Sequence, residues 1–405
     1  MDVEEPWADI IKAKAIETGG IMESVVVLLP CDSYDGETVY QKIKTGIELL
    51  GGWDHLIRKD EKILLKPNLV RKAEVERAVI THPAVVGAVA RLLREEGYEK
   101  IGCGDSCGVG SALKVMEGTG MDTVLEKYKI QVEDFNQGSI VEYPEGKIGK
   151  EFFMARPVQE TDALINVCKM KTHALERITG GVKNLYGCIS GLHKAQGHTR
   201  YSNADSFARM LVDLNQKICP RLCIMDGIVA MDGNGPTSGD PVPMNLMLMS
   251  RDPVALDSVF CRLVHLNPEM VPTNIYGEKM GLGTWRTENI RIFTPDGEIT
   301  MEQMVKIYGN PDYRVDRRKQ RKNIWNKLDF VMKHFQKKPY VDMQLCKKCG
   351  ICVEACPVEG KAISFQNGRK QPPVYDYKKC IRCFWCQEMC PHKAIKVKWI
   401  MKIGI

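Results

Sequence analysis

The chain has 405 residues, of which 44% are hydrophobic and 27% charged, a composition typical of globular proteins. This length predicts about two or three domains, no apolar run reaches the roughly 20 residues that cross a bilayer, and the acidic start Met-Asp-Val-Glu-Glu is unlike a secretory signal. The net charge of +6 is local: residues 314–338 hold ten basic and two acidic residues, or +8, which leaves −2 elsewhere and argues against a nucleic-acid-binding surface spread over the fold.

The first part of the chain alternates between β-branched runs and segments with helical spacing. Buried strands are predicted at residues 23–30, 62–65 and 100–103, after a lead-in at 1–22. Helices are predicted between them, at 38–50 and from Val85 to Leu93, the second with Thr81 as its N-cap. This alternation predicts βαβ units in an α/β fold, with a mainly parallel sheet flanked by helices.

The second part continues the alternation. Strands are predicted at residues 161–167, 222–225, 244–249 and 290–293, and helices at 204–218 and 253–264, the latter capped by Asp252. A glycine-rich loop spans residues 233–239. Neither a P-loop nor a dinucleotide-binding glycine fingerprint is present.

Polar residues follow several predicted strands. Ligands of parallel α/β sheets bind beyond the carboxyl ends of the strands, so residues placed there are candidates for a binding site. The candidates for binding a substrate are Lys66, Asn68, Asp105, Lys169, Asn184 and Asp226.

Three residues in this region are candidates for catalysis: Lys171, His173 and Lys183. Lysine and histidine at a strand end can bind a carboxylate or phosphate, His173 can act as a general acid or base, and a buried Lys183 can act as a base or nucleophile. Asp105 and Asp226 could hold a metal ion or orient His173. The structural alternative is a solvated loop.

The segment Lys169-x-Lys171-Thr172-His173, followed by Gly180-Gly181-Val182-Lys183-Asn184 and Gly187, resembles the domain of unknown function 362 family, together with Asn68 and Asp226-Gly227. The resemblance covers roughly residues 60–265. It implies a fold and, because members often carry a C-terminal ferredoxin module, cluster binding. It implies no reaction.

The order of His173, Gly180-Gly181-x-Lys183, Gly187 and His198 is also similar to the core of nickel-pincer lactate racemases. That resemblance implies a proton-accepting His173, an anchor for the pincer cofactor at Lys183 and a nickel ligand at His198. Asn184 and Tyr186 depart from the usual surroundings. Only His82 or His193 is available as a second catalytic histidine.

The C-terminal part contains the pattern C-x-x-C-x-x-C-x-x-x-C-P twice, and zinc knuckles and disulfides are the alternatives to a cluster site. The pattern resembles the two-[4Fe–4S] ferredoxin module, in which the fourth cysteine of each half binds the other cluster. The resemblance implies one cluster on Cys346, Cys349, Cys352 and Cys390, and a second on Cys380, Cys383, Cys386 and Cys356. Clusters and reduced thiols both fit an oxygen-poor cytoplasm, as in an anaerobe.

These observations predict four segments: a lead-in at 1–22, an α/β domain at 23–310, a basic helical linker at 311–340 and a ferredoxin domain at 341–400. Ile324, Leu328, Val331 and Phe335 recur at helical spacing in the linker and predict a solvated helix packed on the α/β domain. An anionic partner or membrane surface is the alternative, and nucleic acid is the least favoured partner.

Three functions agree with the sequence. The first is an iron–sulfur oxidoreductase that acts on a small organic anion, with electrons from a ferredoxin or reductase. The second is a non-redox racemase or isomerase in which the cluster module is structural or regulatory. The third is an electron-transport subunit that docks to a partner enzyme and has no small-molecule site.

Overall fold

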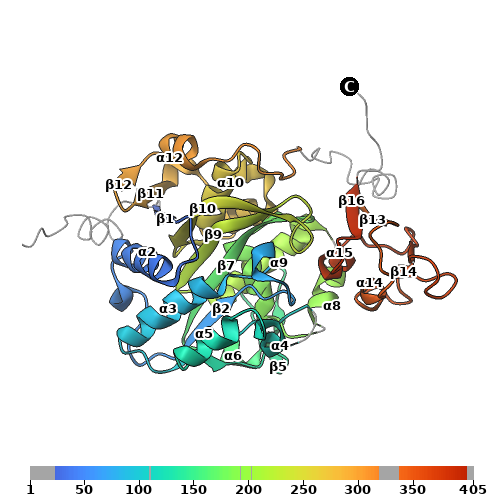
Figure 1. Cartoon of the computed structure of the whole chain (residues 1–405), viewed down its shortest axis with the longest axis horizontal. Coiled ribbons are helices and arrows are strands. Elements are labelled where there is room, and N and C mark those ends of the chain that lie inside the picture. Colours follow the sequence, from blue (N-terminus) through green and yellow to red (C-terminus); the bar gives the residue numbers. More distant parts are fainter. Residues whose placement is uncertain (1–22, 109–110, 192, 202, 319–336, 399–405) are drawn as a thin grey trace, which may run out of the picture.

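The computed structural model describes residues 23–108, 111–191, 193–201, 203–318 and 337–398. The predicted lead-in at 1–22 and the apolar stripe of the linker lie outside the described residues. A large sheet domain, called the body (residues 23–318), is followed by a small cysteine-rich domain, called the module (residues 338–398). Figure 1 shows the module at one side of the body, with α15 toward the body and α14 and β14 farther out.

The body is built on a ten-stranded mixed sheet with the order β12-β11-β1-β10-β9-β7-β2-β3-β4, and β8 pairs with β7 beside this path. The pairs β2–β3, β3–β4, β2–β7, β7–β9 and β1–β11 are parallel. The predicted α/β class with a mainly parallel sheet is therefore confirmed. The strands are β1 (Ser24–Pro30), β2 (Ile63–Pro67), β3 (Ile101–Cys103), β4 (Gln131–Val132), β7 (Ala163–His173), β8 (Arg177–Thr179), β9 (Leu222–Asp232), β10 (Asp240–Ser250), β11 (Ile290–Thr294) and β12 (Gly297–Ile299).

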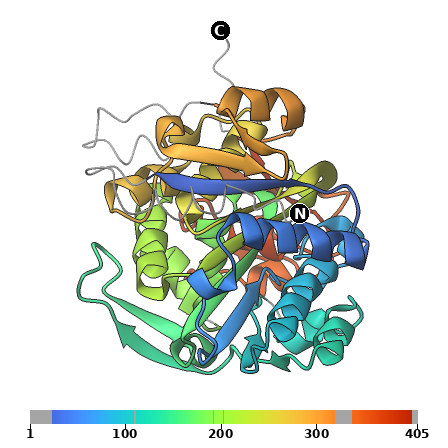
Figure 2. The same ribbon diagram turned by 90° about the vertical axis from the view of Figure 1, so that its left-hand side faces the viewer.

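Helices cover both faces of the sheet because successive side chains of each strand point to opposite sides. In β1, Val27 and Leu29 pack on the side of α2 and α3, whereas Val26 and Leu28 pack on the side of α10. Figure 2 shows α2 and α3 side by side over one face. The first layer holds α2 (Gly36–Leu49), α3 (Pro83–Glu95), α4 (Ala112–Met116) and α5 (Met121–Lys127), and the second holds α7 (Gly181–Asn184), α9 (Ala204–Ile218) and α10 (Pro253–Leu263).

Side-chain caps fix where several helices begin. Asp252 accepts hydrogen bonds from the amides of Val254 and Ala255 at the start of α10, as predicted. The prediction that Thr81 caps α3 is wrong, because His82 is the N-cap and accepts from the amide of Ala84. Thr81 instead joins the segment after β2 to strand β7, accepting from the amide of Asn68 and donating to the carbonyl of Val167.

Two strands extend well beyond their predicted carboxyl ends. β7 extends to His173 instead of ending at residue 167, and β9 extends to Asp232 instead of 225. Polar residues in these extensions give a loop-like pattern, but β8 pairs with the end of β7 and β10 pairs with β9 along this stretch. Lys169, Lys171 and His173 therefore lie within a strand and not in the loop after it.

The remaining elements are peripheral or belong to the module. In the body they are the hairpin β5 (Gly138–Glu142) and β6 (Glu151–Ala155), and the helices α6 (Arg156–Gln159), α8 (His193–Arg200), α11 (Pro272–Lys279) and α12 (Met301–Tyr308). In the module β13 pairs with β16 and β14 pairs with β15, and its elements are β13 (Lys338–Val341), α14 (Ile351–Glu354), β14 (Ile363–Ser364), β15 (Val374–Tyr375), α15 (Trp385–Met389) and β16 (Ile395–Lys398). Across the described ranges, the helices are too short or too polar to span a bilayer.

Candidate functional site

Lys66 and Asp105 form a buried ion pair at the carboxyl edge of the sheet. Lys66 is the penultimate residue of β2, Asp105 follows β3, and the Lys66 Nζ to Asp105 Oδ1 distance is 2.8 Å. Asp105 also accepts a 2.7 Å hydrogen bond from the amide of Leu69. Gly187 packs directly on this pair, since a Cβ atom there would lie 2.0 Å from Asp105 Oδ1. Any side chain at position 187 would therefore displace the buried ion pair, which explains why glycine stands there.

Lys169 and Asp226 form a second buried ion pair, 2.7 Å apart, within the adjacent parallel strands β7 and β9. The Tyr34 hydroxyl donates to Asp226 and accepts from Lys169, both at 2.8 Å. The backbone amide of His82 donates to the other carboxylate oxygen of Asp226, and the His82 ring stacks on Tyr34. Asp226 thus has an internal partner on each oxygen and does not contact His173.

Lys171 is held by a set of amide and carbonyl groups. Its ammonium group donates to Asn68 Oδ1 at 2.5 Å and to the carbonyl of Val79 at 2.9 Å. Asn68 in turn donates to Asn184, whose own amide group donates to Asn166. Burial, and then the charges of Lys183 and Lys169, hold the pKa of Lys171 well below its ordinary value.

His173 at the end of β7 contacts the module. Its Nδ1 accepts hydrogen bonds from the amides of Leu175 and Glu176, so the ring proton is assigned to Nε2. Nε2 donates to the carboxylate of Glu388 in α15 over 2.8 Å, and both side chains are buried. Burial, and then the charge of Lys183, lower the pKa of His173 to about 4, so the ring is neutral at pH 7.

Glu388 is an internal anion between the two domains. Burial by itself would raise its pKa, but the charge of Lys183 and the hydrogen bond from His173 lower the pKa of this carboxyl overall. Sequence reasoning missed Glu388 because it lies between two cysteines of the cluster motif. The sequence offers one hint, because acidic residues are rare in the module: residues 338–398 hold five acidic residues beside twelve basic ones.

Three polar side chains in this region, Lys183, Glu176 and His198, lack internal partners among the described residues. Lys183 is half-buried, and no acceptor among the described residues lies within hydrogen-bond distance of its ammonium group. Both oxygens of Glu176 and both ring nitrogens of His198 are likewise buried without a partner in the described part of the chain. The His198 ring stacks on Phe207 and contacts Trp385 of the module. We call Lys171, His173, Glu176, Lys183 and His198 the polar cluster, and its unpartnered buried groups make it a candidate ligand site.

The module is fixed over this cluster by the glycine-rich loop at 233–239. Thr237 donates to the carbonyl of Glu388 at 2.7 Å, and Gln387 donates to the carbonyl of Gly235 at 2.9 Å. Met389 packs beside Val70 of the body. These contacts place α15, which includes Cys386, directly against the polar cluster.

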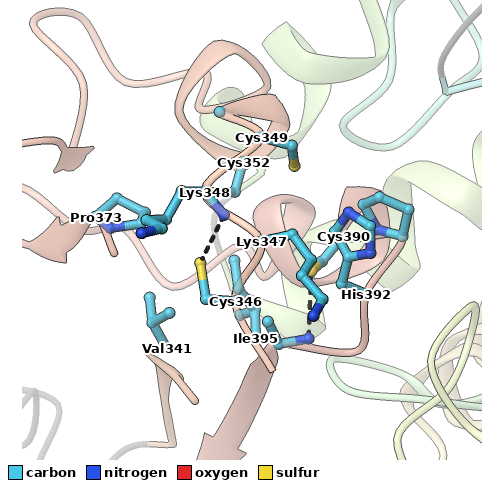
Figure 3. A pocket seen from close by; sticks show the side chains of 13 residues that line it. Val341, Cys346, Lys347, Lys348, Cys349, Cys352, Pro373, Cys390, His392 and Ile395 are labelled. Atoms are coloured by element: carbon cyan, nitrogen blue, oxygen red, sulfur yellow. Dashed lines mark hydrogen bonds between the residues drawn. The ribbon is translucent and has the colours of Figure 1, made fainter. Parts of the chain in front are cut away.

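The first group of four cysteines lines one small pocket of the module, shown in Figure 3: Cys346, Cys349, Cys352 and Cys390. Burial, and then the three neighbouring thiols, raise the pKa of Cys352 to about 12. The backbone amides of Lys348 and Ala394 donate to sulfur atoms of this group at 3.4 and 3.3 Å. Convergent thiols with amide N–H donors are the environment that holds and tunes an iron–sulfur cluster, so the residues fit this group.

The second group surrounds Cys386. Its thiol lies near those of Cys383 and Cys380, and Cys356 lies near Cys380 and Cys383. Tyr375 contacts Cys386 Sγ at 3.0 Å, and the amide of Ala362 donates to Cys356 Sγ. In the portion of the chain that is described, no three His, Cys, Asp or Glu side chains could hold one metal ion. Cysteines of a cubane cluster bind separate irons and need not meet at one point.

The structure separates the predicted site residues into pairs and one cluster. Asp105 and Asp226 are paired with lysines, so the hypothesis that they orient His173 is wrong. His82 and His193 lie outside the polar cluster, because His82 stacks on Tyr34 and His193 stacks on Phe153. Lys171, His173, Lys183 and His198 do gather near Glu388, as their mutual effects on pKa values indicate.

The fold and the cysteine groups define a class: an α/β protein with a C-terminal ferredoxin-type module that binds an iron–sulfur cluster. The chain belongs to the family described as Domain of unknown function (DUF362), whose model matches residues 63–262, and residues 338–391 match a 4Fe-4S dicluster domain. The predicted resemblances to this family and to the ferredoxin module are thus confirmed.

Two known proteins illustrate what the chain is similar to. The Thylakoid-associated protein sll1697 of Synechocystis sp. is 36% identical over 268 residues, which is 66% of this chain and 83% of that protein. The lactate racemase apoprotein from Thermoanaerobacterium thermosaccharolyticum aligns with a TM-score of 0.39 and 14% identity, over 59% of this chain and 56% of the racemase chain. The latter likeness is too low to support a function.

Proposed function

We propose that the chain binds two [4Fe–4S] clusters and transfers electrons between an external redox partner and a small organic anion bound in the body. One cluster would be held by Cys346, Cys349, Cys352 and Cys390, and the other by Cys356, Cys380, Cys383 and Cys386. Bound clusters supply electrons one at a time. The convergence of each set of thiols supports this assignment.

One observation carries the proposal. Glu388 lies two residues from both Cys386 and Cys390. Its carboxylate accepts a 2.8 Å hydrogen bond from His173 of the body. A module that served only as a tether would not need a carboxylate buried in the body, because burying a charge costs several kcal/mol unless it is paired. The redox module and the polar cluster therefore form one functional unit.

The residues of the polar cluster have separate roles in this proposal. Lys183, with no internal hydrogen-bond partner among the described residues, binds the carboxylate or phosphate of the substrate and stabilises negative charge that develops on reduction. His173 is neutral and positions its N–H through Glu388. Lys171, fixed by Asn68 and Val79, adds to the positive potential of the site.

The test uses anaerobic, cluster-loaded protein. The module is reduced with dithionite, excess reductant is removed, and a panel of 2-oxo acids, enoates and phosphorylated acids is added while the cluster spectrum is followed. We expect rapid reoxidation by one class, slowed about 100-fold or more in the Lys183→Met variant with an unchanged cluster spectrum. Reoxidation by none of these acids would reject the proposed reaction.

The domain division and cellular setting form part of the proposal. The boundaries proposed are 23–310 for the α/β domain, 311–340 for the linker and 341–400 for the ferredoxin domain. All 16 cysteines are unpaired in the structure, which supports a reducing, oxygen-poor cytoplasm. Limited proteolysis of the loaded protein tests the linker boundary, since cleavage confined to residues outside 311–340 would contradict it.

A racemase or isomerase is the second candidate, favoured by one observation. His173, Lys183 and His198 come together in the polar cluster, and both nitrogens of His198 lack a partner among the described residues. These are the three positions that the racemase resemblance singles out. Nickel in stoichiometric amount beside the iron, with racemisation of a 2-hydroxy acid that survives loss of the clusters, would support this candidate over electron transfer.

A further inference from the structure

The module, like the linker before it, carries a high positive charge. Residues 338–398 contain twelve lysines and arginines and five acidic residues, a net charge of +7. The whole chain carries +6, so all residues outside this segment sum to −1. One of the five acidic residues, Glu388, is buried against the body and does not offset charge at the outer surface. A surface of this kind attracts an acidic partner over long range.

Apolar side chains are exposed on the same module. Met343 is 65% exposed, Leu345 40% and Val374 52%, and they account for half of the large hydrophobic side chains exposed in the described chain. Exposed Lys347, and Lys348 beside it, line the pocket of the first cysteine group. Figure 3 shows both lysines and Pro373 around Cys346. We call Met343, Leu345, Lys347, Lys348 and Val374 the entry surface.

The two sides of the module differ in what they face. The α15 side is buried on the body through Gln387, Glu388 and Met389. The pocket of the first cysteine group is lined by module residues alone. The entry surface therefore adjoins the first cysteine group, with Leu345 at the edge that meets the body, whereas Cys383 and Cys386 flank Trp385, which contacts His198.

We propose that the entry surface binds a small, acidic electron-carrier protein. Its basic side chains match the charge of such a partner, and its apolar side chains supply the dry centre that a short-lived redox complex needs. In the complex the reduced carrier loses one electron and the module gains it. This inference rests on the proposed function, because it assumes that the module is loaded with clusters.

The experiment measures binding of a purified plant-type [2Fe–2S] ferredoxin, an acidic probe, to the cluster-loaded full chain by calorimetry. The test variant combines Met343→Ser and Lys347→Glu. A matched control on α12 combines Ile307→Ser, 63% exposed, and exposed Lys306→Glu. We expect the Kd of the wild type to rise about tenfold between low and high salt, the test variant to bind about tenfold more weakly, and the control to bind as the wild type does.

Three outcomes would overturn the inference. The first is no saturable binding of ferredoxin, and the second is equal binding by the test and control variants. The third is that the test variant loses binding to phosphatidylserine vesicles but still binds ferredoxin. Iron content and the cluster spectrum are recorded for every variant. Reduction by dithionite bypasses the carrier. If the chain binds no ferredoxin but still reduces an organic acid with dithionite, only the entry surface is rejected. Lost dithionite-driven reduction with intact ferredoxin binding would reject the proposed reaction alone.

Discussion

His173 and Glu388 are joined by a 2.8 Å hydrogen bond although they are 215 positions apart and belong to different domains. The bond has a defined direction, because two backbone amides occupy Nδ1 of His173 and leave the Nε2–H for the carboxylate. Lys183 adds a positive charge beside the pair. The position of the module on the body is thus tied to the protonation state of one imidazole.

Removal of Glu388 should destabilise the docked module. Glu388→Ala leaves the His173 N–H and the charge of Lys183 without an anionic partner, and we expect a loss of about 3–5 kcal/mol in the free energy of unfolding. Glu388→Gln retains an oxygen that accepts from His173 and should lose only about 1–3 kcal/mol. Denaturant unfolding of the cluster-loaded protein, followed by fluorescence and cluster absorbance, measures both values.

The matched control is Glu354→Gln on α14, because Glu354 is an exposed acidic residue of the same module. We expect this change to stay within about 0.5 kcal/mol of the wild type. If Glu388→Ala were equally mild, the contact between His173 and Glu388 would not hold the two domains together.

The free energy of unfolding should fall as the pH is lowered from about 6.5. The pKa of His173 is about 4 in the folded protein, first because of burial and then because of Lys183, and about 6.5 in the unfolded chain. Between these values the unfolded state binds more protons, so stability present above pH 6.5 is lost toward pH 4, by up to about 1.4 kcal/mol per pH unit for each such histidine.

Replacing His173 with asparagine should flatten this pH dependence. His82, with a pKa of about 4, and His198, with a pKa of about 3, are lowered mainly by burial and act in the same direction, so part of the slope should remain. His55→Asn is the control, since His55 is exposed. An unchanged slope in His173→Asn would mean that the imidazole is not buried neutral.

Replacement by methionine should reduce the stability of the protein at Lys171 and the binding of an organic anion at Lys183. Lys171→Met removes the donor to Asn68 and Val79 in a fully buried position, and we expect a loss of about 2–4 kcal/mol in stability. Lys183→Met removes no hydrogen bond to a described residue, and relief of its repulsion of Lys171 offsets the loss of its attraction to Glu388, so stability should change by less than about 1 kcal/mol. Binding of an organic anion, measured by calorimetry, should be lost in Lys183→Met. A large loss of stability on replacing Lys183 would assign it a structural role.

The sequence predicted the scaffold well where short-range chemistry decides it. The N-cap at Asp252 and the helix Ala204–Ile218 were both predicted at their observed positions, and the strand-end rule brought Lys66 and Asp105 together. The sequence did not predict that Lys169, Lys171 and His173 lie within a strand. These residues belong to the part of β7 that pairs with β8 and β9, and their polar pattern is typical of a loop. Glu388 was beyond prediction, since its partner depends on how one domain rests on another.

If each cysteine group binds its own cluster, a substitution in either group should remove the iron of that cluster alone. Cys346→Ser removes a thiol from the first group and Cys380→Ser one from the second, so each variant should fall from about eight irons per chain to about four. Cys219→Ser is the control, because Cys219 is an exposed cysteine of the body. Iron and sulfide analysis of anaerobically purified protein gives the counts. Four irons in the wild type would contradict the second cluster.

Gly187→Ala should be among the most damaging single changes in the body. The new methyl group would lie 2.0 Å from Asp105 Oδ1 and 2.5 Å from Lys66 Nζ, and both partners are buried. Separating them leaves two buried charges unpaired, so we expect a loss of about 3–5 kcal/mol in the free energy of unfolding. Gly36→Ala is the control, because no atom lies within 4 Å of a Cβ there and alanine favours α2. If both variants unfold at the denaturant concentration of the wild type, Lys66 and Asp105 can move apart freely, and the carboxyl edge of the sheet is not the rigid floor that the polar cluster requires.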